Sequence, residues 1–223
     1  MLAGQTLVAN DGYEVALFPM PYLRMSQDEG GDYSHVGTYN IDLVGWGANG
    51  RILAAPIYAP CTCKVVYLEN TYGSGNIRVF QSVNQVHTPS GLQYIHFYFC
   101  HDNNPVATSV GQVFNQGVIC SHTGTYGNVT GDHTHTCVGY GTWVSWSHNI
   151  TTRSSGHQDL TYRLHYWNAF YVNDTVISQG YGHNWVEWDI PPTPVTYVAY
   201  NRFPWVLYAR KLRNKNEIKK KLN

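Results

Sequence analysis

Two histidines separated by a single residue, His133 and His135, are the first candidates for metal chemistry in this chain. In an extended strand, residues two apart point to the same side, so both imidazoles can reach one site. Glycines interrupt the preceding run, residues 124–131, and indicate a tight turn that leads into the pair. The spacing therefore predicts a strand that presents two histidines to one metal or substrate.

Residues elsewhere in the chain supply the remaining groups of a hydrolytic zinc site. Catalytic zinc is usually held by three side chains and keeps a fourth position for water, whose pKa falls to about 7. His35 and Asp42 share one short segment, and with His135 they would form a His/Asp/His ligand set for one zinc ion. His133 would then serve as general base for the water, and His101 as a donor to the oxyanion.

The elements that must position these groups are short strands. Apolar runs bounded by glycine and proline turns predict them, and nothing between residues 35 and 143 has a sustained helical period. The predicted strands cover residues 57–59, 64–68, 77–80, 93–99, 110–113 and 117–120. The fold class is therefore mainly β, an antiparallel sheet with long loops and little helix.

The chain divides by composition into three parts. We expect an irregular lead-in over residues 1–30, a catalytic domain over 31–190, and a linker-like basic tail over 191–223. Within the domain, the polar stretch 142–165 is typical of a long surface loop, and 167–173 is predicted as a further strand.

Charge and hydropathy limit the partners of the chain. It has 223 residues, of which 13% are charged, and half of its fourteen Lys and Arg residues lie between Arg210 and Lys221. We interpret that basic run as a solvated end or linker, so no nucleic acid is expected. No apolar stretch is long enough to span a membrane, and the first ten residues do not resemble an export signal.

The cysteines predict little chemistry. Cys61, Cys63, Cys100, Cys120 and Cys137 lack the paired spacing of a structural zinc site and are expected to be buried small apolar residues. Cys61 and Cys63 are the one pair that would suit a bridge or a metal. A cysteine peptidase using Cys100 or Cys137 remains an alternative.

Several segments in order resemble the lysostaphin-type zinc peptidases over residues 35–138. These are Ala55–Pro60, Tyr98–His101, Val110–Val113 and the glycine-rich run that ends at His135. The resemblance implies a lysostaphin-like fold with zinc held by His35, Asp42 and His135 and with His101 and His133 in catalysis. It also implies cleavage of peptide bonds in bacterial peptidoglycan. His96 is the alternative to His101, and the position of the Val-Gly-Gln segment selects His101.

The chain also departs from that family. Six residues rather than three separate His35 from Asp42, and Asp132, Thr134 and Thr136 replace the usual neighbours of the histidine pair. The longer spacing and the proline-containing lead-in are similar to lysostaphin-like domains in tail-knob proteins of short-tailed bacteriophages. This implies a virion protein at the phage tail tip that contacts other tail proteins and the cell wall.

Two other functions are compatible with the same residues. One is an inactive structural or wall-binding module of a phage tail. The other is an endolysin, held in the host cytoplasm until lysis. The cleaved bond, a glycine-rich bridge or a D-alanyl crosslink, is left open by the sequence.

Overall fold

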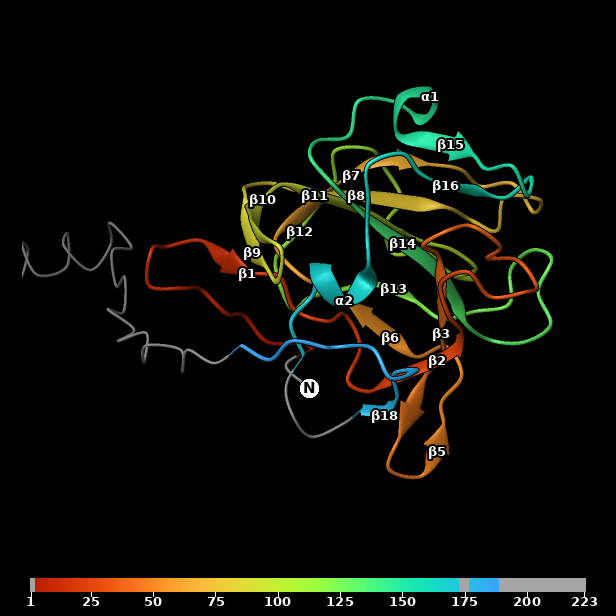
Figure 1. The fold of residues 1–223 in the computed structure, drawn as a ribbon, viewed down its shortest axis with the longest axis horizontal. Helices are drawn as coiled ribbons and strands as arrows, with labels where there is room; N and C mark the ends of the chain where they lie inside the picture. The colour runs from red at the N-terminus through yellow and green to blue at the C-terminus, as the bar shows by residue number, and fades with distance from the viewer. Residues whose placement is uncertain (1–2, 173–176, 189–223) are drawn as a thin grey trace, which may run out of the picture. The chain divides into compact units, whose positions relative to one another are not determined.

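A nine-stranded sheet dominates the computed structural model, which describes residues 3–172 and 177–188 (Figure 1). Its strands follow the order β12 (Val113–Phe114), β7 (Cys63–Leu68), β8 (Arg78–Ser82), β11 (Ile95–Phe99), β14 (Thr134–Tyr140), β3 (Ile41–Leu43), β2 (Leu23–Gln27) and β18 (Ile177–Gln179), with β17 (Arg163–Leu164) also paired to β14. Every pairing in this sheet is antiparallel except that of β18 with β2. The mainly antiparallel β fold is therefore confirmed.

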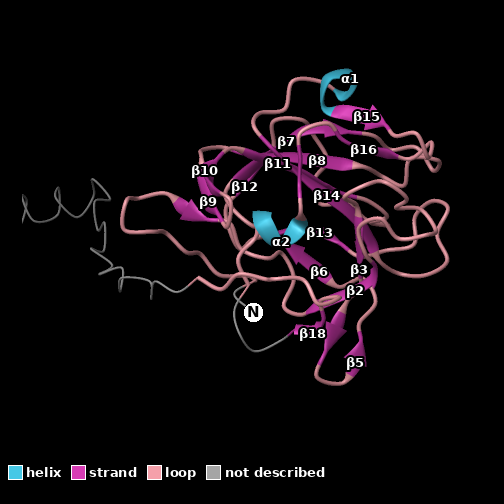
Figure 2. Cartoon of the chain, in the orientation of Figure 1, coloured by secondary structure: helices cyan, strands magenta, loops and turns pink. Residues whose placement is uncertain are grey.

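Smaller sheets surround the large one. They are β1 (Glu14–Val15) with β9 (Val86–Thr88) and β10 (Gly91–Gln93), β6 (Pro56–Tyr58) with β13 (Ile119–His122), β4 (Trp46–Gly47) with β5 (Gly50–Arg51), and β15 (Ile150–Thr152) with β16 (Gln158–Leu160). Helix is limited in the described residues to α1 (Trp146–Asn149) and α2 (Tyr166–Ala169) (Figure 2). None of the described helices has the length and hydropathy needed to cross a membrane.

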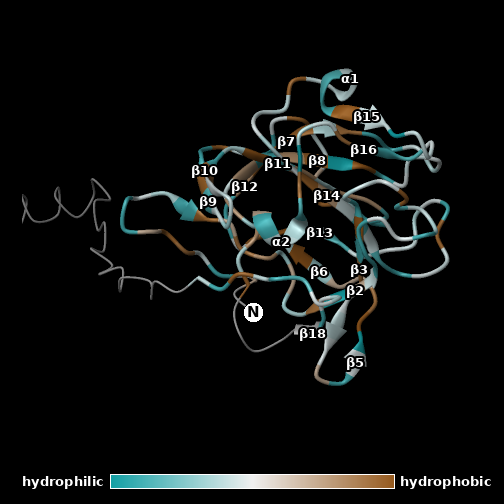
Figure 3. Cartoon of the chain, viewed as in Figure 1, coloured by the Kyte–Doolittle hydropathy of each residue, from teal (hydrophilic) through white to brown (hydrophobic). Residues whose placement is uncertain are grey.

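An aromatic core lies beneath the central strands. Phe80 of β8 packs against Phe97 and Phe99 of β11, with ring centroids 5.6 and 5.9 Å apart. All three side chains are buried, and brown segments gather around β6 and β11 in Figure 3. Burying each aromatic ring contributes on the order of 2 kcal/mol, so this cluster makes the central strands a rigid support for whatever they carry.

The first thirty residues differ from the predicted irregular lead-in. They contain β1 and β2, and β2 buries Leu23 and Met25 while Arg24 between them is less buried, as expected for a strand over a core. Phe18 is also buried in the main cluster. The prolines before β2 interrupt only the chain that precedes it, so this segment belongs to the sheet.

The region after residue 141 also differs from prediction. Residues 142–165, expected as a surface loop, include α1 and the hairpin of β15 and β16. The strand predicted over 167–173 is wrong, because residues 166–169 form α2. Tyr166, Ala169 and Phe170 are the buried positions, and that spacing is helical rather than alternating. The predicted basic tail, residues 191–223, lies outside the described residues.

A buried acid links the end of the first segment to α2. Oε1 of Glu29 accepts a hydrogen bond from the backbone N–H of Tyr166 at 3.1 Å, and Oε2 lies 2.5 Å from Nδ1 of His165. Burial raises the pKa of Glu29 to about 8, with further raising by Asp28. The raised pKa favours the protonated acid at neutral pH, in which the carboxyl O–H can donate a hydrogen bond to Nδ1 of His165.

This acid gives a prediction for stability. The folded state holds the proton of Glu29 more tightly than an unfolded chain, in which the glutamate pKa is 4.5. The stabilisation that protonated Glu29 gives to the folded state is therefore complete below about pH 4.5 and is lost as the pH rises through about 8. Glu29→Gln keeps both hydrogen bonds without a titrating proton. Between about pH 5 and pH 8.5 the wild type should lose on the order of 4 kcal/mol more unfolding free energy than the variant. Urea denaturation at both pH values measures this, and equal losses would contradict the protonated assignment.

Candidate metal centre

Strand pairing brings two of the predicted ligands together. Asp42 of β3 and His135 of β14 are direct partners in an antiparallel pair, so their side chains lie on the same face of the sheet. On β14, Thr134 and Thr136 are fully buried, whereas His135 is only partly buried. The sheet therefore points His135 away from the core, as the alternation in the sequence predicts.

His35 reaches the same place from a turn before β3. Its carbonyl accepts a hydrogen bond from the backbone N–H of Thr38 at 2.9 Å, and Gly37 supplies the left-handed conformation (φ 74°) that closes the turn. The chain then enters β3 at Ile41. The residues between His35 and Asp42 thus include a turn, and the longer spacing does not separate the two side chains.

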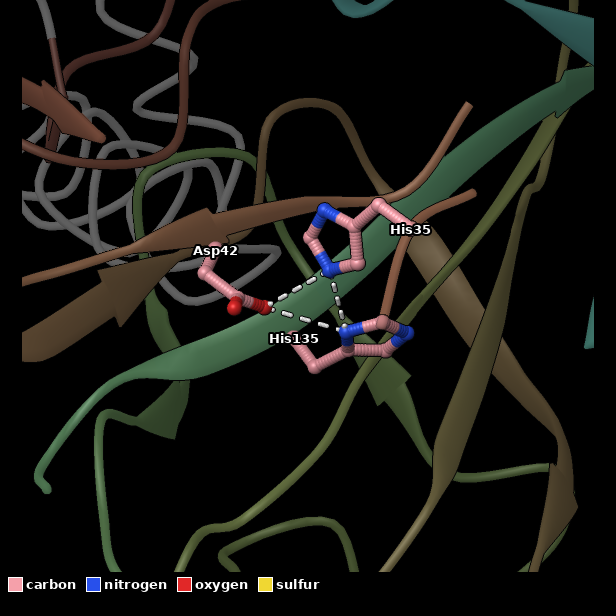
Figure 4. A group of neighbouring side chains, drawn as sticks. All are labelled: His35, Asp42 and His135. Atoms are coloured by element: carbon pink, nitrogen blue, oxygen red, sulfur yellow. Dashed lines mark hydrogen bonds and ion pairs between the residues drawn. The ribbon is translucent and has the colours of Figure 1, made fainter. Parts of the chain in front are cut away.

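Three donor atoms converge in a small triangle (Figure 4). Nε2 of His35 lies 3.2 Å from Oδ1 of Asp42 and 3.0 Å from Nδ1 of His135, and that Nδ1 lies 3.0 Å from the same Oδ1. Ligands about 2.0 Å from a tetrahedral zinc ion are about 3.3 Å apart. The triangle is close to that size, so the three predicted ligands fit a zinc ion.

The protonation states also suit a metal. Nδ1 of His35 donates to the carbonyl of Asp28 at 2.9 Å, which leaves a lone pair on Nε2. Burial alone would raise the pKa of Asp42, but hydrogen bonds and charge from His135 and His35 outweigh it and hold that pKa well below its usual range. Burial lowers the pKa of His135 and favours its neutral ring. The set therefore offers one carboxylate and two imidazoles.

The two predicted catalytic histidines lie beside this triangle. The rings of His101 and His133 are 4.7 Å apart between centroids, and Nε2 of His133 is 3.7 Å from Oδ1 of Asp42. Nδ1 of His133 donates to the carbonyl of Gly131 at 2.8 Å, and Nδ1 of His101 donates to that of Tyr126 at 2.9 Å. Because a carbonyl only accepts, each neutral ring carries its lone pair on Nε2. The Nε2 atoms are therefore the ring atoms that are free to interact with a substrate.

The surroundings of His101 favour the neutral form of its ring. Burial and the neighbouring His133 lower the pKa of His101 to about 4, so the ring is neutral at pH 7. A neutral ring whose Nδ1 proton is bound to Tyr126 cannot also donate from Nε2 to an oxyanion. His101 can become that donor only after its Nε2 has taken up a proton.

Glycines allow the backbone of His101 to adopt its conformation. His101 has φ 76°, a left-handed value that is rare for residues other than glycine and is found at functional sites. A Cβ on Gly75 would lie 2.6 Å from Nδ1 of His101, and a Cβ on Gly124 would overlap the His101 carbonyl. These two positions have to be glycine for the ring to lie where it does. The glycine-rich turn noted in the sequence thus shapes the site.

The other histidines considered from sequence lie elsewhere. His96 is buried, donates from Nδ1 to the carbonyl of Gly141 and contacts Trp143, and it is not among the residues that line the cleft. Nδ1 of His122 lies 3.3 Å from Oδ2 of Asp102, and His122 does not line the cleft either. Among the described residues, His101 and His133 are the unligated histidines nearest the triangle.

A cleft of about 1480 Å³ is lined by Asp42 and His135 of the triangle and by the two catalytic candidates. Its walls include Tyr33 and Tyr72, which are 81% and 60% exposed, together with Glu69 and Arg51. None of these four residues belongs to a spaced motif, so the sequence gives no signal for them. Only the fold shows that they share a surface with the histidines. The cleft is large enough for an extended peptide.

Comparison with known proteins gives one sequence relative of note. The chain is 32% identical over 178 residues to Morphogenesis protein 1 of Bacillus phage B103, an alignment that covers 78% of this chain and 44% of that protein. The chain thus spans less than half of the relative's length. No protein-family profile matches the chain.

The solved structures similar to the chain include peptidases. A zinc-containing peptidase from Vibrio cholerae is 19% identical, with 60% of this chain and 43% of that chain covered and a TM-score of 0.42. The catalytic domain of a prophage-encoded protein from Enterococcus faecalis is 18% identical (57% and 88% covered, TM-score 0.41). The antimicrobial peptidase lysostaphin from Staphylococcus simulans is 15% identical (62% and 63% covered, TM-score 0.39). The chain is therefore similar in sequence to a phage morphogenesis protein, and lysostaphin is among the solved structures that were found for it.

Proposed function

We propose that this chain is a zinc-dependent endopeptidase that hydrolyses peptide crosslinks of bacterial peptidoglycan. The observation that carries the proposal is the convergence of Nε2 of His35, Oδ1 of Asp42 and Nδ1 of His135 within 3.0 to 3.2 Å of one another. One carboxylate and two imidazoles are ligands that zinc prefers in catalytic sites. Zinc held there would polarise the scissile carbonyl and lower the pKa of the attacking water.

The remaining chemistry falls to two side chains of the protein. Nε2 of His133 lies 3.7 Å from Oδ1 of Asp42, outside the three converging ligands, and its Nδ1 is held by the Gly131 carbonyl. His133 is therefore the side chain that takes the proton of the attacking water. His101 lies against it with a second free Nε2. The proton that His133 takes from the water makes the His133–His101 pair a hydrogen-bond donor. The pair then stabilises the oxyanion and passes this proton to the leaving amine.

The proposed substrate and the proposed phage role are supported by sequence similarity. The motifs shared with lysostaphin-type peptidases support peptidoglycan as the substrate, and the similarity to a phage morphogenesis protein supports a role in the virion. We propose that the chain acts at the phage tail tip on the cell wall during infection, in contact with other tail proteins. A domain over residues 31–190, extended by the strands of the first segment, would carry the activity.

The cysteine-peptidase alternative has no support from the described residues. All five cysteines are buried and free of disulfides, including Cys61 and Cys63. Cys100 lines the cleft, but burial and the nearby Asp42 raise the pKa of its thiol well above the usual range. Burial and Asp159 do the same for Cys137. A nucleophilic cysteine needs the thiolate, so the histidine site is the better candidate.

Digestion of purified cell walls tests the proposal. Protein loaded with zinc should release new amino groups and peptides whose masses correspond to cleaved crosslinks. Removal of the metal with a chelator should stop release, zinc should restore it, and thiol reagents should have no effect. An inactive wall-binding module would bind the walls and release nothing. Cleavage that survives complete metal removal would overturn the zinc assignment.

A further inference from the structure

One permanent positive charge lies in the cleft. Arg51 is the single Lys or Arg side chain among the described residues that line it. The acids there are already engaged, because Asp42 contacts the histidines and Glu69 accepts hydrogen bonds from Tyr67 and Thr71. The cleft therefore offers an anionic group one unmatched partner, the guanidinium of Arg51.

Arg51 is held next to the catalytic pair. It lies on β5, in a hairpin with β4, and its Nη2 donates to the backbone carbonyl of Asp132, the residue before His133. No other hydrogen bond of this guanidinium is found among the described residues. Four of its five N–H groups thus remain for a ligand that lies beside His133.

The contact is built into the fold rather than made by a free side chain. The carboxylate of Asp132 accepts from Thr123 Oγ1 at 2.5 Å through Oδ1 and from the backbone N–H of Ala54 at 3.0 Å through Oδ2. Ala54 has φ 48°, a left-handed conformation that Asp132 helps to hold. Asp132 therefore fixes the chain just after Arg51 and accepts the Arg51 guanidinium on its own carbonyl.

We propose that Arg51 is a specificity-determining residue that binds a carboxylate of the substrate close to the scissile bond. The inference rests on the proposed peptidase function and extends it to a substrate class. Arginine pairs with carboxylates through two parallel N–H···O bonds, a geometry that an amide cannot reproduce. The enzyme then prefers anionic peptides, such as D-alanyl crosslinks with free carboxylates, over amidated crosslinks and over neutral glycine bridges.

Paired substrates test this assignment. Crosslinked muropeptide dimers with free carboxylates are compared with the same dimers after conversion of those carboxylates to amides. For the zinc-loaded wild type, kcat/KM should be at least about 10-fold higher for the carboxylate dimers than for the amidated dimers. Arg51→Gln should bring this ratio close to one, chiefly through KM, and Arg51→Lys should keep part of it because the charge remains.

Arg24→Gln is the matched control. Arg24 stacks on Trp46 of the same hairpin, with 4.4 Å between Cζ and the ring centroid, but does not line the cleft. This variant loses the same charge and should keep the wild-type ratio. A ratio unchanged in Arg51→Gln, or lost equally in Arg24→Gln, would overturn the role of Arg51. A purely structural role would instead slow both substrates equally through kcat.

A binding experiment separates this inference from the proposed function. Calorimetry with His133→Ala loaded with zinc measures the affinity for the intact dimers, with and without the additional Arg51→Gln change. A carboxylate preference that disappears with Arg51→Gln supports the inference even if the wild type cleaves nothing, in which case hydrolysis is the part that fails. Hydrolysis without any preference for carboxylates leaves the peptidase proposal intact and refutes the role of Arg51.

Discussion

Replacing His135 with alanine should abolish zinc binding and wall hydrolysis together. Its Nδ1 is one corner of the triangle, 3.0 Å from both other ligand atoms, and two remaining ligands would leave the metal open to solvent. We expect zinc affinity to fall by at least about 1000-fold, because the variant loses both the His135 ligand and the contact of His135 with Asp42. Elemental analysis after dialysis, alongside release of wall peptides, measures both effects.

His148→Ala is the control for this loss. His148 is exposed, and the hydrogen bond that its backbone makes to Ser145 does not need the imidazole. This variant should keep one zinc per chain and full activity. If His135→Ala retained a full equivalent of zinc, the triangle would not be the metal site.

Replacing His133 with alanine should separate zinc binding from catalysis. Its ring contacts the Gly131 carbonyl and faces the carboxylate of Asp42, but it is not one of the three converging ligands. Zinc content and the unfolding midpoint should therefore stay near the wild-type values. Turnover should fall by about 10²- to 10⁴-fold, the usual contribution of a general base.

Kinetics of wall-peptide release at saturating zinc measure the effect of His133→Ala. His96→Ala would not be a suitable comparison, because His96 is buried in the core. His157 lines the same cleft, with no predicted role in proton transfer, so His157→Ala is the matched variant and should change turnover far less. Near-full activity in His133→Ala would show that another group accepts the proton.

The features of the site that follow from strand parity could be predicted from the sequence. His133 and His135 are two apart, so any strand through them presents both to one side, and the structure puts the intervening Thr134 in the core. The convergence of His35 and Asp42 on His135 needed more, namely the pairing of β3 with β14 and a turn at His35. The resemblance to a known family supplied that information, since spacing alone leaves many pairings open.

Other features depended on contacts between residues distant in sequence. The first segment was expected to be irregular, yet Leu23 and Met25 are buried because β2 pairs with β3. The need for glycine at position 75 arises from a ring 26 residues later in the chain, on His101. Arg51 likewise reaches Asp132 across 81 residues. No local pattern reports such contacts, so propensity and periodicity could not predict them.

A zinc titration of the metal-free chain, followed by the rate of crosslink cleavage in purified walls, shows whether the chain is a zinc endopeptidase. We expect no cleavage without zinc and a rise that saturates at one zinc per chain, because His35, Asp42 and His135 form one ligand set. A rate independent of zinc, or no cleavage at full zinc occupancy, would contradict the account.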